Sequence, residues 1–443
     1  MKVLKFGGTS VGSVDSIRQI QHIIARQTDD CIVVVSALGG ITDQLLKAAH
    51  LALETGEEYM EIYQQIRQRH LDMIHTLITN TTVQQMLCHE IERILDELRS
   101  ILFGVHLIKD LSPKSEAAIV SYGERMSSRI VTAALPGAVR KNSLEFIRTE
   151  HKHGQILLNS ELTEQLIHEN FTPIPHLAVC PGFISKDGKT DEITNLGRGG
   201  SDYTASILAA TLNAEVLEIW TDVNGFMTAD PRLIPEAYTI QSLSYVEATE
   251  LCNFGAKVVY PPTIYPVCAK NIPIRILNTF CLDNTGTIIQ AQAEKDARHV
   301  CGLSSIRDVA MITVSGLSMV GVIGVNQRIF GALAAAGVSV FLVSQASSEN
   351  STTLGVQEKD CDIAVEVLTR EFAEEIKVGS MYPMLVQQGL AAVSIVGEKM
   401  HNTPGIAGKL FGTLGRNGIS VIAFAQGAKE TNISFVVPQQ QLS

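Results

Sequence analysis

An internal repeat constrains the C-terminal part of this chain more than any other feature of its sequence. Residues 311–356 align without a gap with residues 392–437, at an offset of 81 and with 12 identities. Unrelated segments of this length would share about three identities at typical residue frequencies. Each copy has the pattern strand, helix, strand, strand, and residues 360–376 add a helix after the first copy. The pattern therefore predicts two similar modules of strands and helices.

The second copy is shorter than the first at its C-terminal end. With its added helix, the first copy makes most of a ferredoxin-like unit, whereas only residues 438–443 follow the second. A sheet that lacks this helix would expose apolar side chains on one face. We therefore expect the second module to be incomplete and the chain to be a fragment of a longer protein. The alternative is that dimer contacts or the first copy cover this face.

The first 280 residues follow a different pattern, in which short β-rich runs alternate with longer helical segments. This alternation predicts an α/β domain with a mostly parallel sheet and helices on both faces. Residues 43–135 are almost entirely helical in pattern, which indicates an inserted helical subdomain. The chain becomes polar after residue 282, so we place the first domain at 1–282 and a linker at 283–309. The repeat modules then occupy 310–388 and 389–443.

Composition narrows the class of protein. The chain carries 46 acidic and 35 basic residues, and its net charge of −11 argues against a general affinity for nucleic acid. Its eight cysteines form no C-x-x-C pair, so neither a zinc site nor a disulfide framework is expected. No apolar run reaches the roughly 18 residues of a membrane span, and the N-terminus lacks an apolar signal region. We expect a cytoplasmic protein without a membrane partner.

Two glycine-rich segments each follow a predicted strand or loop and open a predicted helix. The first is KFGGTS at 5–10, where backbone amides can approach a phosphate and the lysine can neutralise its charge. The second is GRGGSD at 197–202, where Arg198 can hold a carboxylate through two hydrogen bonds and Asp202 can orient an acceptor. The alternatives are a tight turn for the first segment and a helix N-cap for the second.

Further polar residues follow the predicted strand at 215–220. Loops beyond the carboxyl ends of parallel strands bind ligands in open α/β sheets, so Asp222, Asp230 and Arg232 are candidates for holding nucleotide and metal. The same Asn-Gly and Asp-Pro pairs also mark ordinary turns. Lys257 can add a second cation near a phosphate, although a solvated surface lysine is the common alternative.

Two weaker patterns do not predict a site. GFISKDGKT at 182–190 has five residues between its glycines where a P-loop needs four, and Asp187-Gly188 favours a hairpin turn. His151 and His153 lie near Glu150, but three polar residues in a loop are usually only solvated. We therefore expect no metal site formed by protein side chains alone.

Taken together, the motifs resemble those of the aspartokinases in the amino-acid-kinase family. They are KFGGTS at 5–10, SALGGIT at 36–42, YGERMS at 122–127, GRGGSD at 197–202, WTDVNG at 220–225, TADPR at 228–232 and FGAK at 254–257. The repeat resembles the paired ACT modules of these enzymes. The resemblance implies a carbamate-kinase-like sheet domain followed by two ferredoxin-like ACT modules, the second incomplete.

The resemblance also implies an activity, which is ATP-dependent phosphorylation of L-aspartate to 4-phospho-L-aspartate, on the route to lysine, threonine and methionine. ATP and Mg²⁺ would bind around Lys5, Gly7, Gly8, Ser10, Thr221, Asp222, Met227, Asp230, Arg232 and Lys257. Aspartate would bind near Thr42, Glu124, Arg198, Gly199, Ser201 and Asp202. Arg198 would then pair with the α-carboxylate and Glu124 with the ammonium group. Lys5, Lys257 and Mg²⁺ would neutralise the transferring phosphoryl group, and Asp202 would orient the substrate or Lys5.

This chain departs from the family pattern at two positions near the implied nucleotide site. Similar enzymes usually have Asp at the position of Asn224 and Tyr at the position of Met227. An aromatic stack on the adenine is therefore not expected, although a methionine thioether can still cover the face of a ring.

Three segments resemble the bifunctional aspartokinase/homoserine dehydrogenases more than the monofunctional lysine-sensitive enzymes. They are EIWTDV at 218–223, SLSYVEATEL at 242–251 and VSQASSE at 343–349. Gln345 and Gln426 occupy equivalent repeat positions and resemble threonine-contacting residues. The resemblance thus implies inhibition by threonine rather than lysine, and a homodimer or larger oligomer formed through the ACT modules. The alternatives are repeats that only build a dimer, another amino-acid kinase, or a non-catalytic amino-acid sensor.

Overall fold

The computed structural model contains two compact units. It describes residues 1–54, 56–152, 155–256, 258–293, 299–345, 347–348, 350–400, 403–426 and 431–442. The first unit comprises Met1–Phe226, Thr239–Tyr245 and Val258–Glu294, and the second comprises Met227–Tyr238, Val246–Lys257 and Lys295–Ser443. Within the described residues, no helix combines the length and apolar character needed to cross a membrane.

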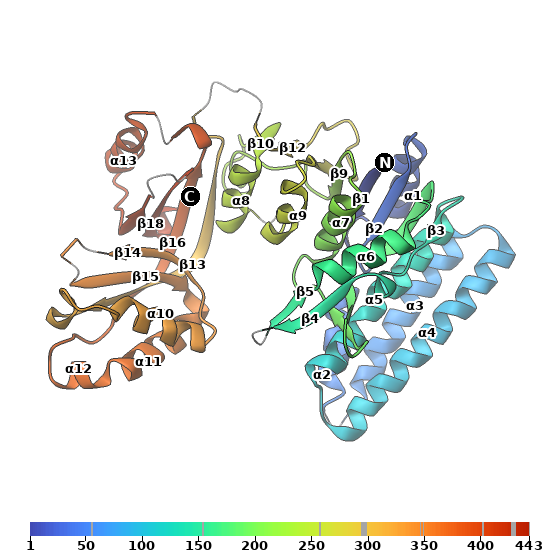
Figure 1. Cartoon of the computed structure of the whole chain (residues 1–443), viewed down its shortest axis with the longest axis horizontal. Coiled ribbons are helices and arrows are strands. Elements are labelled where there is room, and N and C mark those ends of the chain that lie inside the picture. Colours follow the sequence, from blue (N-terminus) through green and yellow to red (C-terminus); the bar gives the residue numbers. More distant parts are fainter. Residues whose placement is uncertain are drawn as a thin grey trace. The chain divides into compact units, whose positions relative to one another are not determined.

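The first unit is built on an eight-stranded sheet with the strand order β10-β12-β11-β9-β1-β2-β6-β3 (Figure 1). The strands are β1 (Lys2–Phe6), β2 (Cys31–Val35), β3 (Val139–Arg140), β6 (Leu177–Pro181), β9 (Leu217–Thr221), β10 (Ser242–Ser244), β11 (Ile274–Asn278) and β12 (Thr287–Gln290). Neighbouring strands in this sheet are parallel except for β11 and β12. Strands β2 and β6 are buried along their whole length, as expected of a sheet covered on both faces. The predicted mostly parallel sheet is confirmed.

Helices lie on both faces of this sheet. Helix α1 (Val14–Ala25) buries Ile17 and Ile20 in one core with Leu4 and Phe6 of β1. Helix α7 (Gly200–Thr211) lies on the opposite face, where Asp202 contacts Lys5 of β1. Successive side chains of a strand point to opposite faces, so Lys5 and its neighbours Leu4 and Phe6 contact different layers. This unit also contains the helical segments α6 (Ser160–Asn170), α9 (Ile264–Cys268), η1 (Ser143–Glu145) and η2 (Pro261–Thr263).

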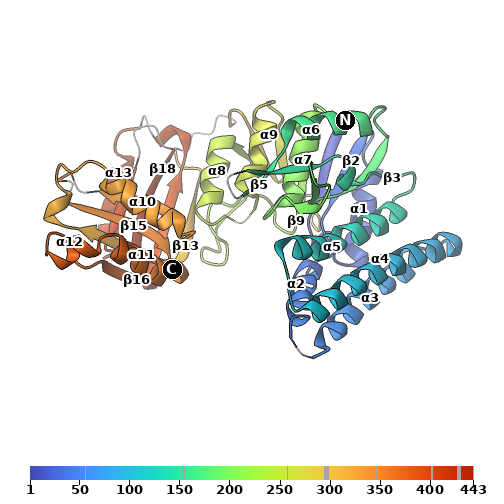
Figure 2. The same cartoon turned by 60° about the horizontal axis from the view of Figure 1, so that its bottom comes forward.

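Four helices separate β2 from β3, in the region where the sequence predicts a helical insertion. They are α2 (Ile41–Leu51), α3 (Glu58–Leu77), α4 (Thr81–Ile108) and α5 (Pro113–Ala134). Helices α3 and α4 lie side by side in Figure 2. Asn80 caps α4 by accepting two backbone N–H groups, and Ser112 caps α5 directly before Pro113, so both helix starts have favourable capping residues.

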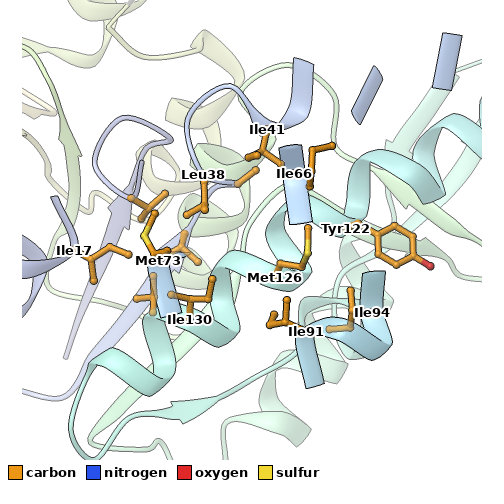
Figure 3. Packing of buried hydrophobic residues seen from close by; sticks show 14 of the residues in the cluster. Ile17, Leu38, Ile41, Ile66, Met73, Ile91, Ile94, Tyr122, Met126 and Ile130 are labelled. Carbon is orange, nitrogen blue, oxygen red and sulfur yellow. The ribbon is translucent and has the colours of Figure 1, made fainter. Parts of the chain in front are cut away.

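The insertion shares its apolar core with α1 and the sheet. Figure 3 shows Ile66 and Met73 of α3, Ile91 and Ile94 of α4, and Met126 and Ile130 of α5 pointing into this core. In folded proteins most of the stability of a helix comes from packing of its apolar face, so burial of these side chains supplies most of the stability of α3, α4 and α5.

A small four-stranded sheet lies beside the main sheet. Its order is β5 (Gln155–Leu158), β4 (Arg148–Lys152), β7 (Ile184–Asp187) and β8 (Ile193–Asn195). Strands β7 and β8 are antiparallel, and Asp187 Oδ1 accepts the backbone N–H groups of Lys189 and Thr190 at 2.9 Å. The hairpin turn predicted at Asp187-Gly188 is therefore present.

The structure differs from the predicted linker over 283–309. Strand β12 lies inside this range and pairs with β10 and β11, and β13 already begins at Gly302. Thr287 and Ile289 of β12 are buried, and the Thr287 hydroxyl donates to the carbonyl of Ile240 at 2.6 Å. A four-residue strand with two buried side chains is hidden in the sequence by the polar residues that surround it.

The second unit contains one six-stranded antiparallel sheet with the order β14-β15-β13-β16-β18-β17 (Figure 1). Its strands are β13 (Gly302–Ser315), β14 (Val340–Gln345), β15 (Ser351–Gln357), β16 (Leu385–Val396), β17 (Ala423–Ala425) and β18 (Asn432–Pro438). Its helices are α10 (Val325–Ala335), α11 (Cys361–Glu371), α12 (Ala373–Lys377), α13 (Ile406–Arg416) and the residues of α8 (Tyr245–Asn253) from Val246 onward. Short helical turns complete it: η3 (Leu317–Met319), η4 (Glu358–Asp360), η5 (Glu398–Met400) and η6 (Gln439–Gln441).

The internal repeat is visible in this sheet. Each copy supplies a long strand, a helix and two further strands, and the long strands β13 and β16 pair at the centre. In the first copy α10 and α11 bury Ile329, Leu333 and Leu368 against the sheet. In the second copy α13 packs near Phe435, but no residue of α13 is buried. The helix α10 of the first copy is thus packed more deeply against the sheet than the helix α13 of the second.

We expect Ile66→Ala to destabilise the first unit by roughly 2–5 kcal/mol, because the substitution leaves a cavity in a fully buried core. Urea unfolding followed by circular dichroism measures the change. Met86→Ala is a matched control, since Met86 belongs to the same insertion and is 69% exposed. Equal effects of the two substitutions would contradict the assigned core.

Candidate active site

A cavity of about 370 Å³ lies at the carboxyl ends of β1 and β2 in the first unit. Its wall contains the lysine that begins the first glycine-rich segment, the whole second glycine-rich segment and three residues of the inserted helices α2 and α5. The predicted residues on this wall are Lys5, Gly8, Thr42, Glu124, Arg198, Gly199, Ser201 and Asp202. Thus all six residues assigned to aspartate from the sequence lie around one cavity, together with two of those assigned to the nucleotide.

Lys5 and Asp202 form an ion pair at the edge of this cavity. Lys5 Nζ lies 2.5 Å from Asp202 Oδ1, and the two side chains are only 11% and 12% exposed. Removal of one partner would leave the other charge poorly hydrated and unpaired, which is strongly unfavourable. The pair therefore fixes the direction of the lysine and joins β1 to the first turn of α7.

Glu124, on α5, is the most buried carboxyl group of the cavity wall, with 3% exposure. Its Oε1 accepts the backbone N–H of Ala37 at 3.1 Å, whereas its Oε2 has no hydrogen-bond partner among the described residues. Burial raises the pKa of Glu124 to about 8, against the opposing effect of the Ala37 hydrogen bond. Such a group can accept a cationic donor that enters the cavity, and a bound cation would favour its ionised form.

Arg198 and the neighbouring glycine present donors to the same space. Arg198 is exposed at the cavity and makes no ion pair with any residue that the structure describes. Gly199 has a φ of +71°, and a Cβ there would lie 2.4 Å from Cβ of Tyr260. Only glycine fits this position, so the loop can hold Arg198 at the mouth of the cavity without strain.

Some of the residues predicted to bind the nucleotide have structural partners instead of a place on the cavity wall. The Gly7 N–H donates to the carbonyl of Trp220 at 3.3 Å. Ser10 is fully buried, and its hydroxyl shares a 2.7 Å hydrogen bond with that of Thr279. These contacts hold the glycine-rich segment against the end of β9 and do not leave the Ser10 hydroxyl open to a ligand.

Residues after β9 form a separate polar group in the first unit. The Thr221 hydroxyl donates to Asp222 Oδ1 at 3.2 Å. Asn224 Oδ1 accepts the side-chain amide of Asn278 at 2.7 Å, which gives the asparagine at this position a specific hydrogen-bond partner.

The other predicted nucleotide residues belong to the second unit. Met227, Asp230 and Arg232 lie in its segment Met227–Tyr238. Arg232 donates to both carboxylate oxygens of Asp230, the shortest distance being 2.7 Å, and this hydrogen-bonded guanidinium lowers the pKa of Asp230. Lys257 lies outside the described residues.

The two glutamines predicted to bind an effector are at the ends of edge strands. Gln345 ends β14, and its Oε1 accepts the side-chain amide of Asn326 in α10 at 3.1 Å. Gln426 directly follows β17 and is exposed. Strands β14 and β17 are the two edges of the six-stranded sheet.

Sequence reasoning left several side chains of the cavity wall unassigned, among them that of Phe183. Phe183 lines the cavity and adopts a φ of +66°, which is unusual for a residue other than glycine. Its N–H donates to the hydroxyl of Thr204 at 3.1 Å, which stabilises this conformation. The segment GFIS gives no signal for such a conformation, because the cause is a contact with α7 that is distant in sequence.

Comparison with known proteins places the fold in a family. The sequence model of the amino acid kinase family matches residues 1–278, and that of the ACT domain matches residues 312–372 and 393–443. The chain is 34% identical over 458 residues to a bifunctional aspartokinase/homoserine dehydrogenase of Haemophilus influenzae, with 100% of this chain and 55% of that protein covered. The chain spans about half the length of the curated relatives it matches.

Two solved structures are similar over almost the whole chain. Escherichia coli aspartokinase III in complex with aspartate and ADP superimposes with a TM-score of 0.83 at 28% identity, covering 99% of this chain and 96% of that one. Clostridium acetobutylicum aspartate kinase gives a TM-score of 0.82 at 25% identity, with 99% and 97% covered. The chain therefore belongs to the amino acid kinase family, and two matches to the ACT domain follow its kinase fold.

Proposed function

We propose that this chain is an aspartate kinase, which transfers the γ-phosphoryl group of ATP to the side-chain carboxylate of L-aspartate. The observation that carries the proposal is a cavity whose wall contains three charged or titratable groups: a guanidinium without an ion pair and a buried carboxyl group with an unpartnered oxygen, both judged among the described residues, and a lysine held by Asp202. The first two groups match the α-carboxylate and the ammonium group of an amino acid. The similar Escherichia coli enzyme, whose structure contains aspartate and ADP, supports this assignment.

In this proposal Arg198 binds the α-carboxylate and Glu124 binds the ammonium group, so the side-chain carboxylate points toward Lys5. That carboxylate is ionised at pH 7 and needs no general base. One of its oxygens bonds to the γ-phosphorus while the bond to the leaving ADP breaks. The protein therefore contributes mainly by positioning the reactants and neutralising charge.

In this proposal the phosphate groups of ATP bind at the part of the cavity wall that contains Lys5 and Gly8. Gly8 lies on the cavity wall, and a Cβ there would lie 3.3 Å from the carbonyl oxygen of Ala37, so the close approach of the neighbouring loop favours glycine at this position. Mg²⁺ bound with the nucleotide would supply further positive charge, with Asp222 of the first unit as a candidate partner. Asp202 would act through Lys5, because its carboxylate pairs with the lysine ammonium group and orients it.

We also propose that threonine regulates this activity through the ACT modules, and that the chain forms a dimer or larger oligomer through them. The position of Gln345 supports the first part, because its hydrogen bond with Asn326 fixes the amide beside the end of an edge strand. An edge strand offers unpaired backbone donors and acceptors to the charged groups of an amino acid.

The first test is the reaction itself. We expect the chain to convert ATP and aspartate into an acyl phosphate that hydroxylamine traps as aspartyl hydroxamate, with little product from glutamate. Lys5→Met should lower kcat by about 100-fold or more, as expected when a charge-stabilising group is lost. Lys2→Met is the control, since Lys2 lies at the opposite end of β1 and pairs with Asp29. Thermal melts check that both variants fold, and ATP turnover that does not depend on aspartate would contradict the proposal.

The second test uses pH. The raised pKa of Glu124 means that its ionised form, which binds ammonium, is scarce below pH 8. We expect the KM for aspartate to rise about tenfold for each pH unit below this value, because a proton must leave before the ligand binds. Glu124→Gln should have a high KM that changes little between pH 6.5 and 8.5. A wild-type KM that is constant over this range would contradict the role of Glu124.

The raised pKa of Glu124 also predicts how the stability of the folded chain changes with pH. A carboxyl group whose pKa is raised on folding stabilises the protein below its ordinary pKa, and this contribution is lost as pH rises through the folded value of about 8. The ligand-free wild-type chain should therefore lose stability toward alkaline pH relative to Glu124→Gln, and thermal melts from pH 5 to 9 measure the difference.

The third test concerns the effector. We expect threonine, and not lysine, to suppress hydroxamate formation, and Gln345→Ala to raise the threonine concentration needed for half inhibition by about tenfold, as for the loss of a ligand hydrogen bond. Gln388→Ala is the control, because Gln388 is exposed on the central strand β16. Inhibition by lysine alone would contradict the choice of effector.

A further inference from the structure

We propose that Arg69 is a positioning residue that holds the loop after β1 (residues 7–13) and the loop after β2 (residues 36–40) in register for phosphoryl transfer. Arg69 lies on α3, and one of its terminal nitrogens donates to the carbonyl of Gly39 at 2.7 Å. The other donates to the carbonyl of Gly12 at 3.0 Å. One guanidinium thus joins the loop after β2 to the loop after β1. The geometry of this clamp is given by these two contacts. Its expected effect on the rate of phosphoryl transfer rests on the proposed function.

The two loops touch each other through their backbones. A Cβ on Gly39 would lie 3.1 Å from the carbonyl oxygen of Gly8, and a Cβ on Gly12 would lie 2.9 Å from the same atom. The space between the loops therefore excludes side chains, so neither loop can anchor the other through interlocking side chains. Gly8 and Gly39 both line the cavity, so a shift of one loop against the other changes its shape.

The side chain of Arg69 suits this role better than any other residue type would. A planar guanidinium directs several N–H groups in a fixed fork, and it can reach two carbonyl oxygens at once. A lysine ammonium has the same charge but cannot reproduce the fork. Substitution of Arg69 by lysine therefore keeps the positive charge but removes the fork of N–H donors, which tests whether the charge or the donor geometry matters.

Arg69 also has no acidic partner among the residues that the structure describes. By contrast Arg67, on the same helix, pairs with Glu92 of α4, with Nε 3.0 Å from Oε2. An unpaired cation behind the loop that is proposed to receive phosphate adds a favourable potential for an anionic ligand. This charge effect acts on nucleotide binding, whereas the two hydrogen bonds act on the geometry of the reacting groups.

The inference gives the helical insertion a function. Helix α3 is fixed by the apolar core that the insertion shares with the sheet, and Arg69 transmits that position to both loops. A misplacement of about 1 Å can lower an enzymatic rate by 100-fold, so the clamp need only prevent small movements.

We would measure kcat, the KM for each substrate and the thermal midpoint of the full chain with Arg69→Lys, Arg69→Met and the control Arg67→Met. Arg69→Lys should keep the KM for ATP within about threefold but lower kcat by about 10- to 100-fold. Arg69→Met should lower kcat at least as much and also raise the KM for ATP, and added guanidinium ion should restore part of kcat. Arg67→Met removes a helix–helix ion pair and should change the thermal midpoint without a comparable loss of kcat.

Hydrogen exchange separates this inference from the proposed function. Backbone amides of residues 8–12 and 38–41 should exchange faster in Arg69→Met than in the wild type, and no faster in Arg67→Met. Absence of hydroxamate from the wild-type chain would reject the proposed function, whereas faster exchange would still support the clamp. Wild-type exchange in both loops, or a kcat for Arg69→Met within twofold of the wild type, would overturn the inference.

Discussion

The parallel pairing of β1 with β2 and β9 is the constraint on which the candidate site depends. Phe6 is in register with Val35 on one side and with Trp220 on the other, so three strands end at the same level of the sheet. The segments that follow them must then share a small volume at this edge. Because the first two segments are rich in glycine, their backbones can pack against each other and leave a cavity for a ligand.

The charged groups of the molecule fall into two kinds that differ in hydration. Lys5, Asp202 and Glu124 are buried, and their charges depend on one another or on a ligand. Asp230 and Arg232 form a hydrogen-bonded pair in which the arginine is 87% exposed, so water screens their attraction. The buried groups interact strongly with one another and with a bound charge, because little water is present to weaken the attraction.

Most of the architecture could be predicted from the sequence, since it depends on patterns that extend over many residues. The alternation of buried strands and helices, the helical insertion and the repeat with its central strands are all of this kind. The strand β12 was missed because two buried side chains among polar neighbours make no recognisable pattern. The exact bounds of a linker depend on which strand finds a partner in the sheet, and that is a property of the folded chain.

The candidate site was predictable for a related reason, but less completely. The resemblance located residues that line one cavity, such as Arg198 and Glu124. It did not distinguish them from Ser10, whose hydroxyl is used inside the fold. Phe183 and Arg69 were not found at all, because their roles arise from contacts with Thr204 and with Gly12 and Gly39 that are far apart in the chain.

The pairing of β13 with β16 has a consequence for how the repeated modules behave. These two strands form a ladder from Gly302 and Val396 at one end to Thr313 and Leu385 at the other, interrupted only by local irregularities. Neither copy can detach without breaking hydrogen bonds that also complete the sheet of its neighbour. The two copies therefore make one cooperative folding unit, and a change in one edge strand can alter the stability of the opposite edge without any hinge between them.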